Sequence, residues 1–195
     1  MAYFDWHQKP GYFNDITRHF RSDAKLLDMG CGTAWLADHF SDYTGIDGSE
    51  EAVRAAAAAG RNVQFADLNG SLSFPDQTFD AVVLKDVLEH LIDPVRVVRE
   101  ARRVLKAGGR VFASAPDAQR WVWDDYTHRR PFTRRAFGLL FSDQGFTIEE
   151  LGYESVMSGT SVLSGITRRK RRPRVLQLAA WLPFVKRNVW LIARR

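Results

Sequence analysis

The feature that most constrains the fold of this chain is a short apolar run that ends in a Gly-Cys-Gly turn. Residues 25–29 (KLLDM) precede Gly30, Cys31 and Gly32, and an apolar stretch with helical character follows at residues 34–40 (AWLADHF). A strand, a tight glycine turn and a helix in this order are typical of the first unit of an open parallel sheet. Such a turn is the usual place where a cofactor is held.

The same alternation of strand and helix continues along the chain. Further apolar runs predict strands over residues 43–46, 62–66, 79–84, 110–114, 146–151 and 188–193. Ser49, Asp93 and Thr133 are suitable N-cap residues for helices over residues 50–59, from residue 94 to before Gly108-Gly109, and up to residue 142. The nearly continuous apolar run at 79–84 predicts a central strand that is buried on both faces. We therefore predict an open, mostly parallel α/β sheet.

The composition fits one globular domain over residues 1–195. The chain is 45% hydrophobic and 26% charged, and its single cysteine excludes an internal disulfide framework or a cysteine-cluster metal site. It has no run of 18 apolar residues, and its first residues lack the layout of a secretory signal. We expect a soluble, cytoplasmic protein that holds no metal.

Charge is divided unevenly along the sequence. Ten of the 28 basic residues lie between Arg168 and Arg195, where no acidic residue occurs, so 18 basic residues face 23 acidic ones in the rest of the chain. An acidic body therefore carries a basic tail. This division argues against a general nucleic-acid-binding surface and places any anionic partner near the C-terminal part of the sequence.

Three carboxylates follow three successive predicted strands. Asp28 stands directly before the glycine turn, where its charge suits a cationic amine and repels a pyrophosphate. Asp47 ends the second strand, where a carboxylate can bind both hydroxyls of a ribose. Asp67 follows the third strand and is placed to bind an exocyclic amine such as that of adenine, with the Leu68 amide as a donor beside it. Together they describe a site for an adenosine with a cationic tail.

Five segments resemble the motifs of the class I S-adenosylmethionine-dependent methyltransferases, specifically the small type 11 group. LLDMGCGTAWLADHF, YTGIDGSEEAV and NVQFADLNG are similar to the first three motifs, and FDAVVLKDVLEHLIDP and RVLKAGGRVFASAP to the fourth and fifth. The resemblance covers residues 25–116. It implies a Rossmann-like fold whose seven-stranded, mostly parallel sheet has an antiparallel last strand and helices on both faces. Ala34 stands where the family often has a third glycine, and we expect little loss because alanine is small.

The resemblance also implies the cofactor, S-adenosylmethionine, with S-adenosylhomocysteine as product. Asp28, Gly30 and Gly32 would hold the methionine part, Asp47 the ribose, and Asp67 and Leu68 the adenine. The backbone around Lys85 would lie under the sulfonium. The predicted cofactor-binding set is Asp28, Gly30, Cys31, Gly32, Asp47, Gly48, Asp67, Leu68 and Lys85. Cys31 is expected to be an inert small residue in the turn.

Residues 117–132 form a predicted loop on the acceptor side of the site. His128 in this loop is the best candidate for a general base, with Tyr126 and Arg129 as acceptor contacts. His90 matches the family pattern and is the second catalytic candidate. A capped, salt-bridged loop and a buried, hydrogen-bonded histidine are the structural alternatives. Residues 1–24 are predicted to form a helical lid, or to pack as a simple N-terminal helix.

An insertion at residues 153–186 is predicted before the last strand. It contains the basic run Arg168–Arg174 and then a short apolar stretch at 175–184, a combination that suits the surface of an anionic membrane. A helix packed on the domain beside a solvated arginine loop is the alternative. This segment predicts a peripheral enzyme on the inner membrane face that acts on a lipid-linked acceptor.

The resulting hypothesis is methyl transfer to an oxygen of a small-molecule or lipid- or glycan-linked acceptor. An RNA-directed methyltransferase is an alternative, because arginines also neutralise phosphates, but LKDV at residues 84–87 is not the motif associated with methylation of base amines. A regulatory protein that binds the cofactor without catalysis is another. A nicotinamide-dependent oxidoreductase is disfavoured because the third glycine of Gly-x-Gly-x-x-Gly is missing.

Overall fold

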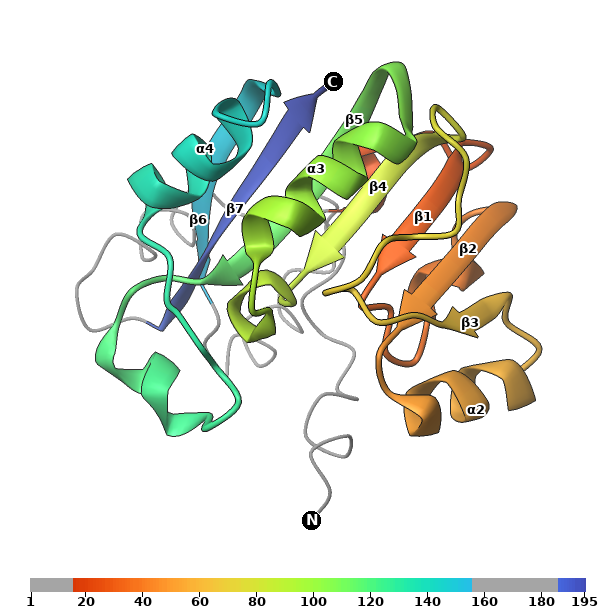
Figure 1. Cartoon of the computed structure of the whole chain (residues 1–195), viewed down its shortest axis with the longest axis horizontal. Helices are drawn as coiled ribbons and strands as arrows, with labels where there is room; N and C mark the ends of the chain where they lie inside the picture. Colours follow the sequence, from red (N-terminus) through yellow and green to blue (C-terminus); the bar gives the residue numbers. More distant parts are fainter. Residues whose placement is uncertain (1–15, 156–185) are drawn as a thin grey trace, which may run out of the picture.

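A single sheet of seven strands organises the protein, in the order β3-β2-β1-β4-β5-β7-β6 (Figure 1). The computed structural model describes residues 16–155 and 186–195. The strands are β1 (Lys25–Met29), β2 (Asp42–Asp47), β3 (Val63–Phe65), β4 (Phe79–Lys85), β5 (Leu105–Pro116), β6 (Thr147–Ser155) and β7 (Arg187–Arg194). The α-helices are α2 (Glu50–Ala58), α3 (Pro94–Val104) and α4 (Arg134–Ser142), and the 3₁₀ turns are η1 (Thr17–His19), η2 (Trp35–Asp38), η3 (Leu88–His90) and η4 (Arg120–Asp124).

The direction of the strands confirms the predicted topology. The pairs β1–β2, β2–β3, β1–β4 and β4–β5 are parallel, whereas β7 runs antiparallel to both β5 and β6. The chain winds outward from β1 to β3 and then returns to β4 on the other side of β1. The boundary between β1 and β4 is therefore the switch point, beside which ligands of open sheets bind.

Helices cover both faces of the sheet, as predicted. Leu27 and Met29 of β1 pack with α3 and α4 on one face, whereas Leu26 packs with η2 and α2 on the other. Because successive side chains of a strand point to opposite faces, a run that is apolar throughout supplies both cores. The side chains at Ala81, Val82, Val83 and Leu84 are at most 1% exposed, so β4 is the central strand that its sequence predicts.

The three predicted N-caps are confirmed. The Ser49 hydroxyl accepts the Ala52 N–H at 3.2 Å, the Asp93 carboxylate accepts the Arg96 N–H at 3.1 Å, and the Thr133 hydroxyl accepts the Ala136 N–H at 3.2 Å. Each cap satisfies one of the N–H groups that the first turn of a helix leaves without an acceptor. These side chains fix where α2, α3 and α4 begin.

Two local predictions are wrong. Residues 34–40 form only the 3₁₀ turn η2, because Ala34 takes a left-handed conformation with φ of 56° and the chain turns again after Asp38. The α3 helix ends at Val104, before the two glycines, because β5 already begins at Leu105. Phe79 of β4 pairs with Leu105 of β5, but Ala81, two residues later, pairs with Arg110, five residues later. The pairing register therefore shifts here, and Gly108 and Gly109 lie in the irregular part of β5.

Parts of the predicted lid and insertion lie outside the described residues. Of residues 1–24, the structure describes residues 16–24, which contain η1. Residues 153–155 belong to β6 rather than to the insertion, and the basic run Arg168–Arg174 is outside the described residues. Among the residues that are described, no helix is long and apolar enough to cross a membrane.

Candidate functional site

The glycine turn after β1 lies at the switch point of the sheet. The Gly30 and Cys31 N–H groups both donate to the Ile46 carbonyl, at 2.8 and 3.0 Å, which holds the turn against the end of β2. Gly30 has a φ of +80°, and a Cβ there would lie 2.7 Å from a Val87 methyl carbon. Gly32 has a φ of +51°, and no atom lies within 4 Å of the place where its Cβ would be. The turn therefore presents backbone to open space, as close approach of a cofactor requires.

Cys31 lies in the same turn with its side chain directed into the protein. It is 5% exposed, and a Cβ on Gly45 of β2 would meet its sulfur at 2.8 Å. Burial, followed by the nearby carboxylates of Asp28 and Asp47, raises the pKa of the Cys31 thiol far above its usual range. The thiol therefore stays protonated and unreactive, and only the backbone of Cys31 faces the turn.

Asp28 is buried beneath the turn. Its side chain is 3% exposed, and Oδ2 accepts the Tyr43 hydroxyl at 2.9 Å. Burial raises the pKa of Asp28 to about 7, although the Tyr43 hydrogen bond opposes that rise. The carboxylate thus joins the end of β1 to β2 through Tyr43, and its contact with the amine of the cofactor stays a prediction.

Asp47 ends β2 and bridges two turns. Oδ2 accepts the Gly32 N–H and Oδ1 accepts the Ser49 N–H, each at 2.8 Å. Its side chain is partly exposed beside Gly48, which is exposed at the start of the β2–α2 connection. A carboxylate oxygen has two lone pairs, so both oxygens retain acceptor capacity toward the hydroxyls of a ribose.

Asp67 and Leu68 follow β3 at the same edge of the sheet. Asp67 is exposed, and its Oδ1 accepts the Asn69 backbone and side-chain amides at 2.9 and 3.0 Å. The Asn69 side chain in turn accepts the Ile92 N–H at 3.0 Å, which joins this loop to the start of the α3 region. Leu68 is 6% exposed and packs in the core. The loop predicted to bind adenine is therefore held by the hydrogen bonds of Asn69 and by the packing of Leu68 in the core.

The end of β4 holds a partly buried ion pair that the sequence did not reveal. The Lys85 ammonium contacts the Asp86 carboxylate, whose other oxygen accepts the Ser114 hydroxyl at 2.8 Å and the Asn188 amide at 2.9 Å. Burial opposes the charge on both groups, but Lys85 lowers the pKa of Asp86, and Asp86 raises that of Lys85. Asp86 thereby ties β4 to β5 and β7 directly beside the glycine turn.

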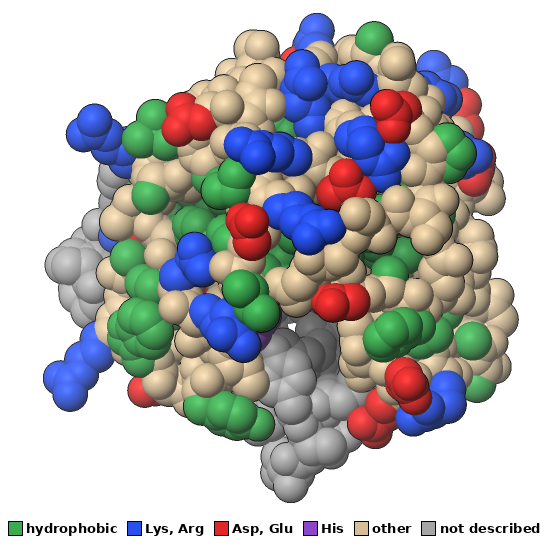
Figure 2. Space-filling view, in the orientation of Figure 1, with side chains coloured by type: hydrophobic (Ala, Val, Ile, Leu, Met, Phe, Trp, Pro, Cys, Tyr) green, Lys and Arg blue, Asp and Glu red, His purple; other side chains and the backbone are tan. Residues whose placement is uncertain are grey.

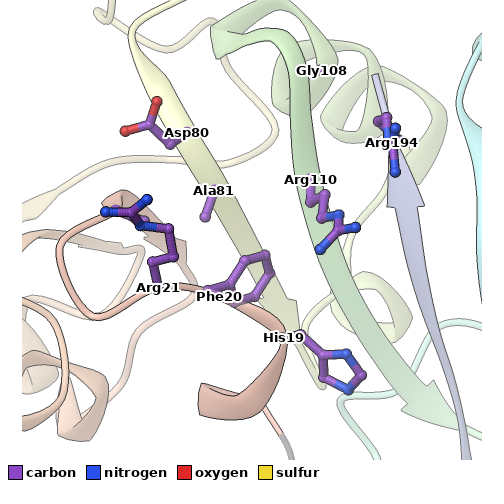
Figure 3. A pocket seen from close by; sticks show the side chains of 9 residues that line it. His19, Phe20, Arg21, Asp80, Ala81, Gly108, Arg110 and Arg194 are labelled. Carbon is purple, nitrogen blue, oxygen red and sulfur yellow. The ribbon is translucent and has the colours of Figure 1, made fainter.

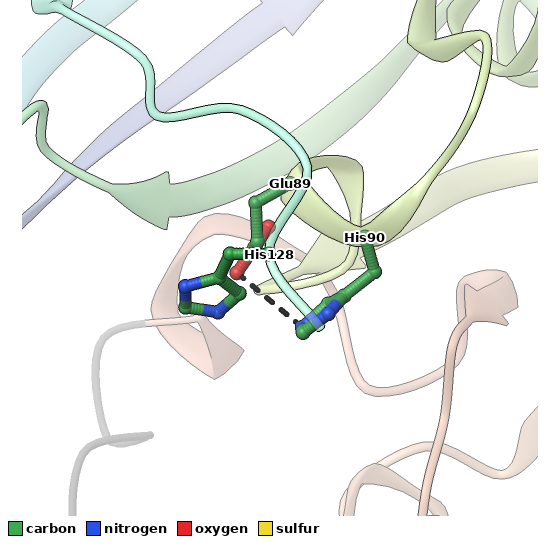
Figure 4. Close-up of side chains that lie close together, drawn as sticks. All are labelled: Glu89, His90 and His128. Atoms are coloured by element: carbon green, nitrogen blue, oxygen red, sulfur yellow. Dashed lines mark ion pairs between the residues drawn. The ribbon is translucent and has the colours of Figure 1, made fainter. Parts of the chain in front are cut away.

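Glu89 and His90 of η3 converge with His128 of the loop at residues 117–132, which the sequence predicts to lie on the acceptor side (Figure 4). One ligand atom from each residue lies within 4.8 Å of the others, and the two imidazole rings are 4.7 Å apart. The Arg129 N–H donates to the Glu89 carbonyl at 2.8 Å, which holds the loop of His128 against η3. The sequence reading selected both histidines but missed Glu89, whose place next to His90 in the fourth motif was the available signal.

The two predicted acceptor contacts lie at the surface. Tyr126 is 90% exposed, and the Arg129 side chain is exposed as well. Residues 117–132 include η4, and an isolated bridge between Asp117 and Phe132 closes the base of this loop. The geometry neither brings Tyr126 into the histidine cluster nor excludes its contact with an acceptor, so its role stays a prediction.

Several charged side chains outside the site form ion pairs. On the face seen in Figure 2, Lys and Arg side chains alternate with acidic ones. Arg103, for example, pairs with Glu100 at 2.9 Å and Asp76 at 2.7 Å. In β7 of the basic tail, Arg187 pairs with Asp117 at 2.7 Å. The basic character of the tail is therefore partly neutralised inside the sheet.

A separate cavity of about 390 Å³ lies at the end of the sheet where the central strand β4 begins (Figure 3). Its lining includes His19, Arg21, Asp80, Arg110 and Arg194. Asp80 stands near the start of β4 and Arg110 pairs with the next residue, Ala81, whereas the glycine turn follows the end of β1 and the histidine cluster lies beyond the end of β4. This cavity is therefore not part of the predicted cofactor site.

Comparisons with known proteins agree with this geometry. A family model described as "Methyltransferase domain" (Methyltransf_11) matches residues 27–113. The uncharacterized methyltransferase YcgJ of Bacillus subtilis (strain 168) is 35% identical over 158 residues, 72% of this chain and 62% of that protein. A ubiquinone biosynthesis O-methyltransferase of Albidiferax ferrireducens is 36% identical over 101 residues, 46% of this chain and 40% of that one. The chain thus spans less than two thirds of either curated relative.

A solved structure supports the fold over nearly the whole chain. It is a SAM-dependent methyltransferase from Methanosarcina mazei, with a TM-score of 0.68 and 21% identity, and the match covers 92% of this chain and 96% of that one. The sheet order and the glycine turn at its switch point define the class I methyltransferase fold. Residues 27–113 match the model of the type 11 group of S-adenosylmethionine-dependent methyltransferases, and the chain is similar to methyltransferases in both sequence and fold.

Proposed function

We propose that the chain transfers a methyl group to a hydroxyl oxygen of a small or lipid- or glycan-linked acceptor. The observation that carries this proposal is the setting of His128 in the Glu89–His90–His128 cluster. His128 Nδ1 lies 2.6 Å from the Val122 carbonyl, which accepts its proton, so Nε2 carries the lone pair of the neutral imidazole. A positioned imidazole nitrogen is suited to remove the proton of a hydroxyl. The printed name of one relative, an O-methyltransferase, agrees with oxygen as the acceptor atom.

Different residues at the strand ends would bind different parts of the cofactor. S-adenosylmethionine supplies an electrophilic methyl group on a sulfonium. Gly32 gives it room to approach the backbone, Asp47 has acceptor capacity for the ribose hydroxyls, and Asp67 and Leu68 lie at the adenine end. The backbone around Lys85, at the end of β4, would lie under the sulfonium. Alignment of the acceptor and exclusion of water then contribute to the rate.

The acceptor is proposed to reach the enzyme from an anionic membrane surface. The segment Arg168–Arg174 holds six basic residues, and each contributes about 1 kcal/mol near such a surface. We expect the chain to sediment with vesicles that contain anionic lipid and to lose this binding when residues 168–174 are deleted. Equal sedimentation of the deleted chain would contradict the proposal.

The test of the reaction uses S-adenosylmethionine labelled in its methyl group. The label is followed in parallel reactions with phenols, carboxylic acids, lipid extract and RNA, for the wild type and for His128→Gln. The proposal expects label in an oxygen acceptor and a loss of about 100-fold in kcat for His128→Gln, with unchanged cofactor affinity. Label in RNA alone would favour the RNA-directed alternative. Tight cofactor binding without label in any acceptor would favour a non-catalytic binding protein.

A further inference from the structure

The Glu89 side chain is buried with a carboxylate oxygen that a cation could bind. The residue is 1% exposed, and within the part of the chain that the structure describes, its Oε2 atom is buried without a hydrogen-bond partner. Buried carboxylate oxygens are normally paired, because an uncompensated one costs several kcal/mol. The orphaned oxygen belongs to the cluster in which His90 and His128 also place a ligand atom.

The groups around His90 fix which of its nitrogens carries the proton. The Thr127 hydroxyl donates to Asp125 Oδ1 at 2.6 Å and lies 3.0 Å from His90 Nδ1. Because the hydroxyl hydrogen is used toward Asp125, its oxygen accepts from His90 Nδ1, and Nε2 therefore has the lone pair. The Val122 carbonyl does the same for His128. A hydrogen bond from one ring nitrogen to a carbonyl, hydroxyl or carboxylate chain is how metal-binding histidines are oriented.

We propose that Glu89, His90 and His128 bind a divalent transition-metal ion of the zinc class. Two imidazole nitrogens and one carboxylate are the ligand set of many zinc sites that keep a fourth position open. The three ligand atoms lie within 4.8 Å of one another. Ligand atoms in a tetrahedral zinc site lie about 3.3 Å apart, so rotation of the side chains on binding brings them closer together.

The fourth position deepens the proposed function, and this step rests on that function. It lies on the acceptor side, where a hydroxyl oxygen can become the remaining ligand. A bound divalent cation lowers the pKa of a coordinated oxygen, so the hydroxyl loses its proton to water and stays on the metal as an anion. The transfer to a hydroxyl oxygen stays as proposed, but when the metal is bound, His90 and His128 act as ligands and the cation replaces the His128 imidazole as the group that activates the hydroxyl. The acceptors that this site favours are hydroxyl compounds that coordinate metals.

Metal binding is tested without any acceptor or cofactor. The tag-free full chain, dialysed against a chelator, is titrated with cobalt(II) while its visible absorption is followed, and zinc is then added to displace the cobalt. We expect one equivalent per chain and a tetrahedral cobalt spectrum. His90→Asn, His128→Asn and Glu89→Gln should each weaken binding by more than 100-fold, and Thr127→Val, which removes only the orienting hydroxyl, by about 10-fold.

The matched control is His39→Asn. His39 is exposed, and its ring contacts Trp35 rather than the cluster, so its replacement should leave the cobalt titration unchanged. Thermal melting identifies any variant that fails to fold, and Thr127→Val keeps the test decisive because all three ligands remain. An unchanged titration in the His90→Asn, His128→Asn double variant would overturn the proposal, as would no binding by the wild type at millimolar cobalt.

Two outcomes separate this proposal from the proposed function. Methyl transfer by a chain that binds no metal would overturn the metal site and leave the function standing. Stoichiometric metal binding lost in the three ligand variants, with no methyl transfer to any hydroxyl acceptor, would support the metal site and contradict the function.

Discussion

The Asp47 carboxylate accepts the Gly32 backbone N–H at 2.8 Å, and it thereby joins the end of β2 to the glycine turn that follows β1. Its other oxygen accepts the Ser49 N–H, so one side chain sets the geometry of two connections at the switch point. The carboxylate predicted to hold the ribose is therefore also the group that shapes the turn beneath it. A substitution at Asp47 acts on the cofactor twice, through a lost ligand and through a loosened turn.

Asp47→Ala should abolish micromolar binding of S-adenosylmethionine and S-adenosylhomocysteine, because both effects act together. Asp47→Asn keeps an acceptor oxygen and should weaken binding by about 10-fold, since a charged acceptor is replaced by a neutral one. Isothermal titration measures both constants. Asp42→Asn, at the exposed other end of the same strand, is the control and should leave both constants unchanged. Equal affinity in Asp47→Ala and the wild type would refute the assignment of the ribose site.

Gly30 is predicted to tolerate no side chain. Gly30→Ala would place a Cβ 2.7 Å from a Val87 methyl carbon at a φ of +80°, so strain and overlap add. We expect the free energy of unfolding to fall by about 2–4 kcal/mol. Gly60 also has a positive φ, +76°, but open space around it, so Gly60→Ala should cost only about 1–2 kcal/mol. Urea denaturation of both variants gives the comparison, and equal losses would mean that Val87 moves freely aside.

The sequence predicted the features that depend on neighbours along the chain. Apolar runs locate the strands, and Ser49, Asp93 and Thr133 locate the helix starts, because both follow from the local backbone. The turn at Ala34 was misread because an apolar run does not reveal a left-handed residue.

The sequence could not predict features that depend on contacts between residues far apart in the chain. Asp86 bonds Asn188, which is 102 residues away, and His90 meets His128 across 38 positions. No periodicity encodes such pairs. The burial of Glu89 likewise follows only from the packing of η3 under the loop after β5.

Asp28 should make stability depend on pH. Its folded pKa of about 7 lies above the unfolded value of about 4, so the folded state holds the extra proton between these values. The stabilisation is complete below about pH 4 and is lost as the pH rises through about 7. Between pH 4 and 7, the titration of Asp28 therefore lowers the free energy of unfolding by about 4 kcal/mol.

Urea denaturation between pH 4.5 and 8 measures this effect. Asp28→Asn should flatten the decline by removing one titrating group, while Glu89, whose pKa is also raised, keeps part of the slope. Tyr43→Phe removes a hydrogen bond that lowers the pKa of Asp28, so it should extend the decline above pH 7. An identical pH profile for Asp28→Asn and the wild type would show that Asp28 does not titrate in this window.

The partly buried pair at the end of β4 should contribute more to the free energy of unfolding than an exposed pair near the start of that strand. Asp86→Ala removes the nearest carboxylate from the Lys85 ammonium and the acceptor used by Ser114 and Asn188. The two side chains are 16% and 28% exposed, so solvent screens the pair in part, and we expect a loss of about 1–3 kcal/mol in urea denaturation.

The exposed pair of Lys106 and Asp80, at 2.7 Å, provides the control for this loss. Both of its side chains are more than 40% exposed, and solvent screens such a pair, so Lys106→Met should cost less than about 1 kcal/mol. Asp86 also carries a left-handed backbone with φ of 51°. Asp86→Asn fits that conformation and keeps an oxygen toward Ser114, and it should therefore recover part of the stability that Asp86→Ala loses. A loss for Asp86→Ala no greater than that for Lys106→Met would mean that β4, β5 and β7 are held together at this end by apolar packing alone.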